Sequence, residues 1–237
     1  MNLVAIETAT ETVAVAVRTS DGLAAELALT GRRRHVESLT PALEHLLHQV
    51  GLEAGQLSAV AVDVGPGLFT GLRVGISAAK GLAQALGIGV VSLSSLDILA
   101  AAAAGSGLRG QVLCAVDARR GEVFAALVEV GATGAVTPSG PPQLLSPEGV
   151  VQMLEGLSVR AVTAVGDGAQ RYGSVLGAVA GVTVVESALA WPPAPTLLAL
   201  AAGLLEAGHA PAEPGSVVPL YMRDADATAN FVQVSRA

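Results

Sequence analysis

The chain has 237 residues, of which 51% are hydrophobic and only 3% are aromatic. This length allows one large domain or two smaller lobes, and a core built from Ala, Val and Leu favours close-packed α/β layers. Thirteen basic and twenty acidic residues give a net charge of -7, which excludes a protein that holds a nucleic-acid backbone unaided. The basic run at 32–34 is expected to be a solvated loop edge.

The single cysteine, Cys114, lies in an apolar run, so we expect it to be buried and no disulfide can form within the chain. A chain that forms no internal disulfide is typical of proteins in a reducing compartment. The N-terminal sequence lacks a basic leader, and polar residues and glycines interrupt the most apolar stretch, 82–104. We therefore expect a cytoplasmic protein without a membrane segment.

The first half predicts a meander of strands followed by alternating helices and strands. The pattern places strands at 3–6, 12–17 and 23–29, a helix at 36–50 with Pro41 in its first turn, a strand at 59–64, a helix at 72–86, a strand at 90–93 and an Ala-rich helix ending near Gly105. The predicted order is βββαβαβ before the Ala-rich helix.

The pattern then restarts in the second half. It places strands at 111–116 and 122–130, a helix at 147–157, strands at 162–165 and around Thr183, and a last helix at 196–207. We expect lobes at 1–105 and 106–190, with 191–237 returning to the first lobe. Two mixed sheets with flanking helices describe the two-lobed α/β fold of actin, hexokinase and Hsp70 (ASKHA), and this fold alone does not give function.

A glycine-rich segment, Gly65 to Arg73, follows a predicted buried strand and leads into a helix. It has neither the lysine of a Walker loop nor the glycine spacing of a dinucleotide-binding turn. Such a segment can hold an anion through free N–H groups at the helix N-terminus. A tight turn is the alternative, and the sequence favours it.

The helix that follows carries small residues at every fourth position, namely Gly71, Gly75, Ala79 and Ala83. A ridge with so few side chains lets another helix approach closely. The ridge either packs within the chain against the 36–50 helix, or both helices present a surface to a second protein. The residues alone leave both alternatives open.

Four segments together resemble the bacterial TsaB (YeaZ) family: Leu3 to Glu11, Gly65 to Gly75, Asp117 to Phe124 and Pro219 to Arg223. The resemblance implies an accessory subunit for forming threonylcarbamoyl-adenosine next to the anticodon of tRNAs that read codons beginning with A. It also implies two partners, the catalytic paralogue TsaD and, through the complex, the small ATPase TsaE. The tRNA would be contacted only indirectly.

Comparison with the catalytic paralogue predicts a subunit without a catalytic residue, metal or cofactor. The paralogue's His-x-x-x-His pair has no counterpart at 91–97, and a transition metal needs such ligands. Thr8 and Thr10 fit a first phosphate-binding turn, but Asp117 and Arg119 place bulky side chains in the second. These four residues are the candidates for residual nucleotide binding. Glu7 of the first lobe and Asp117 of the second either face each other across a cleft between the lobes or are ordinary turn residues.

The leading hypothesis is a non-catalytic subunit that binds TsaD through the two helices. The predicted interface residues are His35, Leu39, Leu43, Leu46, Gly71, Arg73, Gly75 and Ala79. Gly75→Leu is expected to block binding while leaving the monomer folded, and the isolated chain is expected to dimerise through the same helices. The chain lacks a complete set of catalytic residues for an independent kinase or peptidase. Its excess of acidic residues argues against a nucleic-acid-binding module.

Overall fold

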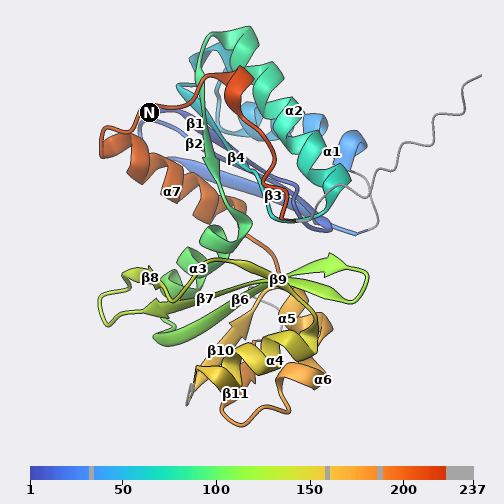
Figure 1. Ribbon diagram of the computed structural model, residues 1–237. Coiled ribbons are helices and arrows are strands. Elements are labelled where there is room, and N and C mark those ends of the chain that lie inside the picture. The colour runs from blue at the N-terminus through green and yellow to red at the C-terminus, as the bar shows by residue number, and fades with distance from the viewer. Residues whose placement is uncertain (32–34, 158–160, 186–188, 223–237) are drawn as a thin grey trace, which may run out of the picture.

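The computed structural model describes residues 1–31, 35–157, 161–185 and 189–222, which form two α/β lobes (Figure 1). The basic run at 32–34 and Arg223 of the last resembling segment lie outside these residues. No helix in the described ranges is long and apolar enough to cross a membrane.

The first lobe is built on a five-stranded sheet in the order β3-β2-β1-β4-β5. Its strands are β1 (Leu3–Glu7), β2 (Thr12–Arg18), β3 (Ala24–Thr30), β4 (Ala59–Asp63) and β5 (Gly89–Leu93). The first three form an antiparallel meander, while β4 and β5 run parallel to β1. The crossover helix between the two parallel strands is α2 (Phe69–Leu86), and α1 (His35–Gln49) follows the meander, with a short 3-10 turn, η1 (Ala54–Gln56), before β4.

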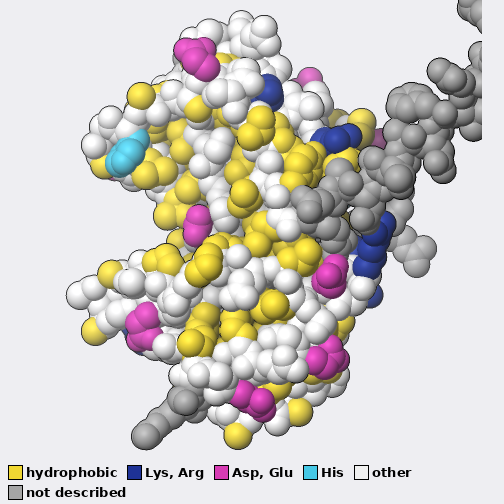
Figure 2. Space-filling model, in the orientation of Figure 1, with side chains coloured by type: hydrophobic (Ala, Val, Ile, Leu, Met, Phe, Trp, Pro, Cys, Tyr) yellow, Lys and Arg dark blue, Asp and Glu magenta, His cyan; other side chains and the backbone are white. Residues whose placement is uncertain are grey.

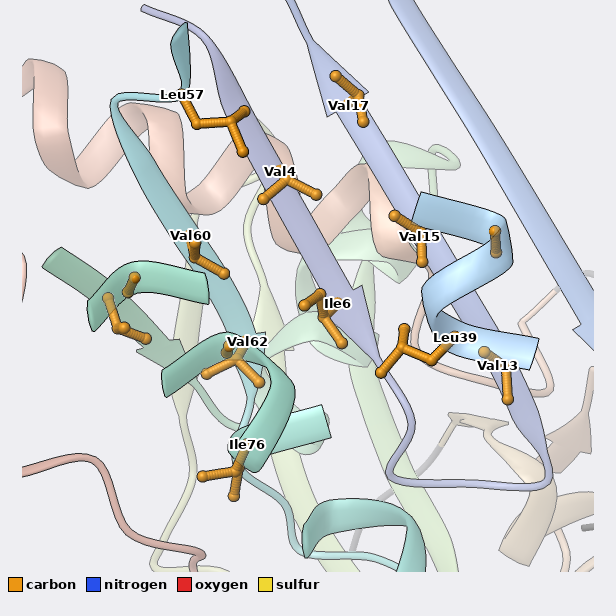
Figure 3. Close-up of a cluster of buried hydrophobic side chains, with 14 of the residues drawn as sticks. Val4, Ile6, Val13, Val15, Val17, Leu39, Leu57, Val60, Val62 and Ile76 are labelled. Carbon is orange, nitrogen blue, oxygen red and sulfur yellow. The ribbon is translucent and has the colours of Figure 1, made fainter. Parts of the chain in front are cut away.

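Both faces of the first sheet are covered, because successive side chains of a strand point to opposite faces. On one face Val4, Ile6 and Val62 pack against Leu39 of α1 and Ile76 of α2 (Figure 3). The other face carries smaller residues, and it is covered by α7 (Ala194–Glu206) from the far end of the chain. The small side chains on that face let the α7 backbone lie close to the sheet.

The second lobe has a six-stranded sheet in which β11-β10-β6-β7-β8 form the main order and β9 pairs with β7. Its strands are β6 (Gly110–Arg119), β7 (Glu122–Val130), β8 (Val136–Pro138), β9 (Gln143–Leu145), β10 (Val162–Val165) and β11 (Val182–Val184). Three helices cover one face: α4 (Pro147–Gly156), α5 (Asp167–Arg171) and α6 (Gly173–Leu176).

The helix α3 (Ser95–Gly105) belongs to both cores and lies where the lobes meet. Ile98 packs into the cluster shared by the first sheet and α7, whereas Leu99 packs into the cluster on the second sheet together with Cys114. The chain therefore passes from one lobe to the other through a helix that both lobes bury.

After α7 the chain runs back over the first lobe as a C-terminal strap, residues 208–222. Ala212 exchanges two backbone hydrogen bonds with Val90 of the edge strand β5, at 2.8 and 2.9 Å. The strap continues through η2 (Pro214–Ser216), where Lys80 of α2 donates hydrogen bonds to the carbonyls of Gly215 and Val217 at 3.3 and 3.1 Å. It thus covers the free edge of the first sheet.

The predicted two-lobed α/β fold is confirmed, since each sheet joins an antiparallel hairpin or meander to parallel strands through helices. The strands at 122–130 and 162–165 lie where they were expected. The expectation for Pro41 is wrong: α1 begins at His35, so the proline lies inside the helix rather than in its first turn.

Candidate functional site

The carboxyl ends of β1 and β4 bring two buried carboxyl groups together on the side of the first lobe that faces Asp167 of the second. Both oxygens of Glu7 accept a hydrogen bond from the Ala9 N–H at 3.1 Å. Oδ1 of Asp63 accepts one from the Gly65 N–H and one from the Ser95 hydroxyl, each at 2.7 Å. Oδ2 of Asp63 receives no hydrogen bond from an N–H or hydroxyl group of the described residues.

The ionisation of each carboxyl group affects that of the other, because burial makes two adjacent negative charges costly. Burial, and then the charge of Asp63, raises the pKa of Glu7 well above its ordinary value. Burial raises the pKa of Asp63 to about 7. Both shifts oppose ionisation, so two negative charges side by side at this buried site are disfavoured.

The β6–β7 turn of the second lobe is filled by its own side chains. Asp117 Oδ1 accepts a hydrogen bond from the Arg119 N–H at 2.9 Å, and Oδ2 accepts one from Arg119 Nη1 at 2.8 Å. Asp167 of α5 accepts a hydrogen bond from the Asp117 N–H at 3.0 Å, and burial raises the pKa of Asp167 to about 6. The Asp117 N–H, the Arg119 N–H and one Arg119 guanidinium nitrogen are therefore already hydrogen-bonded to carboxylates of this lobe.

The structure gives the predicted carboxylate residues different partners. Glu7 shares its site with Asp63, whereas Asp117 is bonded to Arg119 within the second lobe. Sequence reasoning missed Asp63, although the signal was present as a single acidic residue at the end of an otherwise apolar strand. It also missed Asp167.

The β1–β2 turn, residues 8–11, is occupied by contacts from the helices of its own lobe. The Thr8 hydroxyl donates a hydrogen bond to the Gly71 carbonyl at 2.8 Å, and the Thr10 carbonyl accepts one from His35 Nε2 at 2.9 Å. The Leu68 N–H at the start of α2 donates to the Ala9 carbonyl at 2.6 Å. These bonds favour the tight-turn interpretation of the glycine-rich segment.

The small ridge of α2 faces this turn rather than the surface. A Cβ atom added to Gly71 would lie 2.0 Å from the Thr8 carbonyl oxygen, and one added to Gly75 would lie 2.2 Å from Thr8 Oγ1. The expectation that Gly75→Leu leaves the monomer folded is therefore wrong, because there is no room for the side chain. The ridge therefore packs within the chain, but Gly71 and Gly75 meet mainly the β1–β2 turn rather than the 36–50 helix, which corrects the expected partner.

Six of the eight predicted interface residues are consequently buried within the chain, which corrects their expected place on the surface: His35, Leu39, Leu46, Gly71, Gly75 and Ala79. Leu43 is half-buried and Arg73 is exposed. The helical spacing identified the correct helices, but it selected mainly the side that packs on the sheet.

The outer side of the same helices carries exposed apolar side chains that sequence reasoning missed. Val36 is 71% exposed and Phe69 is 51% exposed. The Arg73 guanidinium lies 3.8 Å from the centre of the Phe69 ring, and its Nε donates a hydrogen bond to the hydroxyl of Tyr221, which stacks on Phe69 at 5.5 Å. We call Val36, Leu43, Phe69, Arg73 and Tyr221 the α1/α2 surface.

An apolar groove of about 730 Å³ lies between α3 and α7. Hydrophobic side chains gather around this hollow where the two lobes meet (Figure 2). Among the described residues its lining includes Leu189, Pro193 and Leu200 and carries no charged side chain.

Two further groups bear on catalysis. Cys114 is fully buried, and burial raises the pKa of its thiol to about 12, so the thiolate that attacks a substrate does not form near neutral pH. Within the described ranges, no three His, Cys, Asp or Glu side chains are grouped as metal ligands.

The sequence matches one protein-family model, described as "TsaD: tRNA N6-adenosine threonylcarbamoyltransferase", over residues 22–231. The chain is 31% identical over 224 residues to the tRNA threonylcarbamoyladenosine biosynthesis protein TsaB of Escherichia coli (strain K12), which covers 94% of this chain and 95% of that protein. The protein of the same description from Bacillus subtilis (strain 168) is 35% identical over 129 residues, covering 54% of this chain and 56% of that protein.

Solved structures agree with these relatives. YeaZ from Pseudomonas aeruginosa has a TM-score of 0.77 at 29% identity and covers 93% of this chain and 99% of its own. Another structure from that organism, described as an uncharacterized protein with similarity to peptidase YEAZ, has a TM-score of 0.80 at 30% identity, with 94% and 99% covered. The chain therefore belongs to the TsaB (YeaZ) family of tRNA threonylcarbamoyladenosine biosynthesis proteins.

Proposed function

We propose that this chain is the non-catalytic subunit of the complex that installs threonylcarbamoyl on adenosine next to the anticodon of tRNAs reading codons that begin with A. Its E. coli relative is named for that biosynthesis, and the matching family model is named for the transferase TsaD. In this proposal the chain binds TsaD as its catalytic paralogue, meets TsaE through the complex and contacts tRNA only indirectly.

The observation that carries the non-catalytic assignment is the β6–β7 turn. Phosphate binding in a turn requires free backbone N–H groups and room for the phosphate. Here Asp117 accepts from the Arg119 N–H and from its guanidinium, so side chains occupy the turn. The raised pKa values of Glu7 and Asp63 further reduce the negative charge available to hold a cation.

Partner binding is assigned to the α1/α2 surface. Exposed side chains such as Val36 and Phe69 lose contact with water when a partner covers them, and Phe69, Arg73 and Tyr221 are residue types that contribute strongly to interfaces. The stacking of Arg73 and Tyr221 on Phe69 fixes the ring before binding, which reduces the entropy lost on association. The same surface would pair two copies of the chain when TsaD is absent.

The first experiment is reconstitution of threonylcarbamoyl-adenosine formation from tRNA, threonine, bicarbonate and ATP. Product is expected when this chain is combined with TsaD, TsaE and the carbamoyl-adenylate synthase, and the product is lost when this chain is left out. Product formation or ATP turnover by this chain alone would refute the non-catalytic assignment.

The second experiment tests the surface with a matched pair of variants. Phe69→Asp is expected to weaken TsaD binding at least about tenfold, since truncating a central interface aromatic commonly costs 2 kcal/mol or more. Leu157→Asp is the control, because Leu157 is 53% exposed but belongs to the second lobe. Equal affinities for the two variants, measured by calorimetry, would place the interface elsewhere.

A further inference from the structure

An ion pair joins the two lobes between the β1–β2 turn and the end of β6. Nη2 of Arg119, at the end of β6 in the second lobe, donates a hydrogen bond to Oε1 of Glu11 at 2.6 Å. Glu11 lies at the end of the β1–β2 turn of the first lobe. The two residues are 108 positions apart in the chain, so the contact exists only when the lobes lie close together.

Arg119 is held in place from the side of the second lobe. Its N–H and Nη1 both bind the buried Asp117 carboxylate, and the Asp117 N–H donates to Asp167 of α5. Arg171 of α5 adds a longer ion pair to Asp117, at 3.5 Å. These contacts direct the remaining guanidinium nitrogen toward the first lobe before it meets Glu11.

The pair is partly exposed, with 36% of the Arg119 side chain and 55% of the Glu11 side chain accessible to solvent. Ion pairs of this kind are weak and are screened by salt. If the guanidinium is removed, Glu11 loses its hydrogen-bonded partner in the second lobe. The lobes remain connected through α3 and through the segment that precedes α7.

We propose that the ion pair between Arg119 and Glu11 holds the two lobes together beside the β1–β2 turn, and that the lobes separate about α3 when this ion pair is lost. We call this ion pair the latch. The latch closes when the Arg119 guanidinium binds the Glu11 carboxylate, and it opens when salt screens that pair. It acts within this chain and does not depend on the proposed partner.

The test measures the distance between the lobes by pulsed electron paramagnetic resonance. Spin labels are attached at Gln49→Cys in α1 and Ser174→Cys in α6, both exposed positions, while native Cys114 is buried and stays unlabelled. Measurements are made at about 0.01 M and about 1 M salt, where the Debye length is about 30 and 3 Å. The wild-type chain should show mainly the short distance at low salt and a larger long-distance population at high salt.

The informative variant is Glu11→Gln, which removes the charge in the first lobe and leaves the Arg119 contacts with Asp117 intact. It should raise the ratio of open to closed molecules about fivefold at low salt and remove the dependence on salt. Arg119→Lys keeps a positive charge without the planar fork, so its ratio should lie between those of wild type and Glu11→Gln.

The control is Arg18→Gln. It also removes one charge, and it breaks the 3.7 Å pair with Glu206, but both residues of that pair belong to the first lobe. Its distance distribution should match that of the wild type. Identical distributions for wild type and Glu11→Gln at both salt concentrations would refute the latch, as would an equal shift in Arg18→Gln and Glu11→Gln.

Discussion

Adding one methyl group at Gly75 should destabilise the chain far more than adding it elsewhere in the same helix. A Cβ at this position would lie 2.2 Å from Thr8 Oγ1, so the hydroxyl must move and lose its 2.8 Å hydrogen bond to the Gly71 carbonyl. The lost buried hydrogen bond costs about 1–3 kcal/mol and the overpacking costs about 1–3 kcal/mol. The higher helix propensity of Ala compared with Gly offsets about 1 kcal/mol of this loss in stability.

The net loss expected for Gly75→Ala is therefore about 3 kcal/mol in the free energy of unfolding. Gly81→Ala is the matched control, because Gly81 lies in the same helix and a Cβ there would meet nothing within 4 Å. That variant should be stabilised by about 0.5–1 kcal/mol. Urea unfolding followed by the fluorescence of the single tryptophan, Trp191, measures both.

A double-mutant cycle with Thr8→Ala tests the reason for the loss. Without the hydroxyl, Gly75→Ala should cost at least about 1 kcal/mol less than it does in the wild type. Equal stabilities for Gly75→Ala and Gly81→Ala, or an unchanged cost in the Thr8→Ala background, would show that the ridge does not pack on the β1–β2 turn as described.

Two further predictions concern the buried carboxyl pair and the strap. Burial raises the pKa of Asp63 from 3.8 to about 7. The contribution of the protonated Asp63 to the free energy of unfolding is therefore fully present below pH 4 and is lost as the pH rises through 7, by on the order of 4 kcal/mol. Urea unfolding measured between pH 4 and pH 7 should show a steeper decline in stability for wild type than for Asp63→Asn, and parallel curves would contradict the assignment. Lys80→Met removes the donor to the Gly215 and Val217 carbonyls, so amide exchange in the strap should accelerate about fivefold, whereas Arg18→Gln, which breaks a surface pair with Glu206, should leave strap exchange unchanged.

Most helices and strands could be predicted because their patterns are local. The strand at Glu122–Val130 and the helix at 147–157 are defined by neighbouring residues and by turns at their ends. The three-residue strands β8 and β9 were missed because prolines lie in or close to them, which is typical of turns. The strand β11 has the same length but lies in a run of Val and Thr, which is typical of a strand.

The candidate site was harder to predict because its contacts are long-range. The spacing of Gly71 and Gly75 predicted a close approach correctly, but the group that approaches is Thr8, 63 positions from Gly71. A spacing within one helix does not specify its partner. Similarly, Arg119 was recognised as too bulky for a phosphate turn, while its bond to Glu11 depends on how the two lobes meet.

The position of α7 has a consequence for synthesis on the ribosome. The second sheet has all its strands once β11 has emerged, at Val184, whereas the first sheet still exposes one apolar face until Leu197 and Leu198 arrive. The edge strand of the first sheet gains its partner later still, when Ala212 has emerged. Since chains emerge from the N-terminus, the sheet that is made first is covered on this face only after the second sheet has been made, and the uncovered face is where a chaperone would act on the nascent chain.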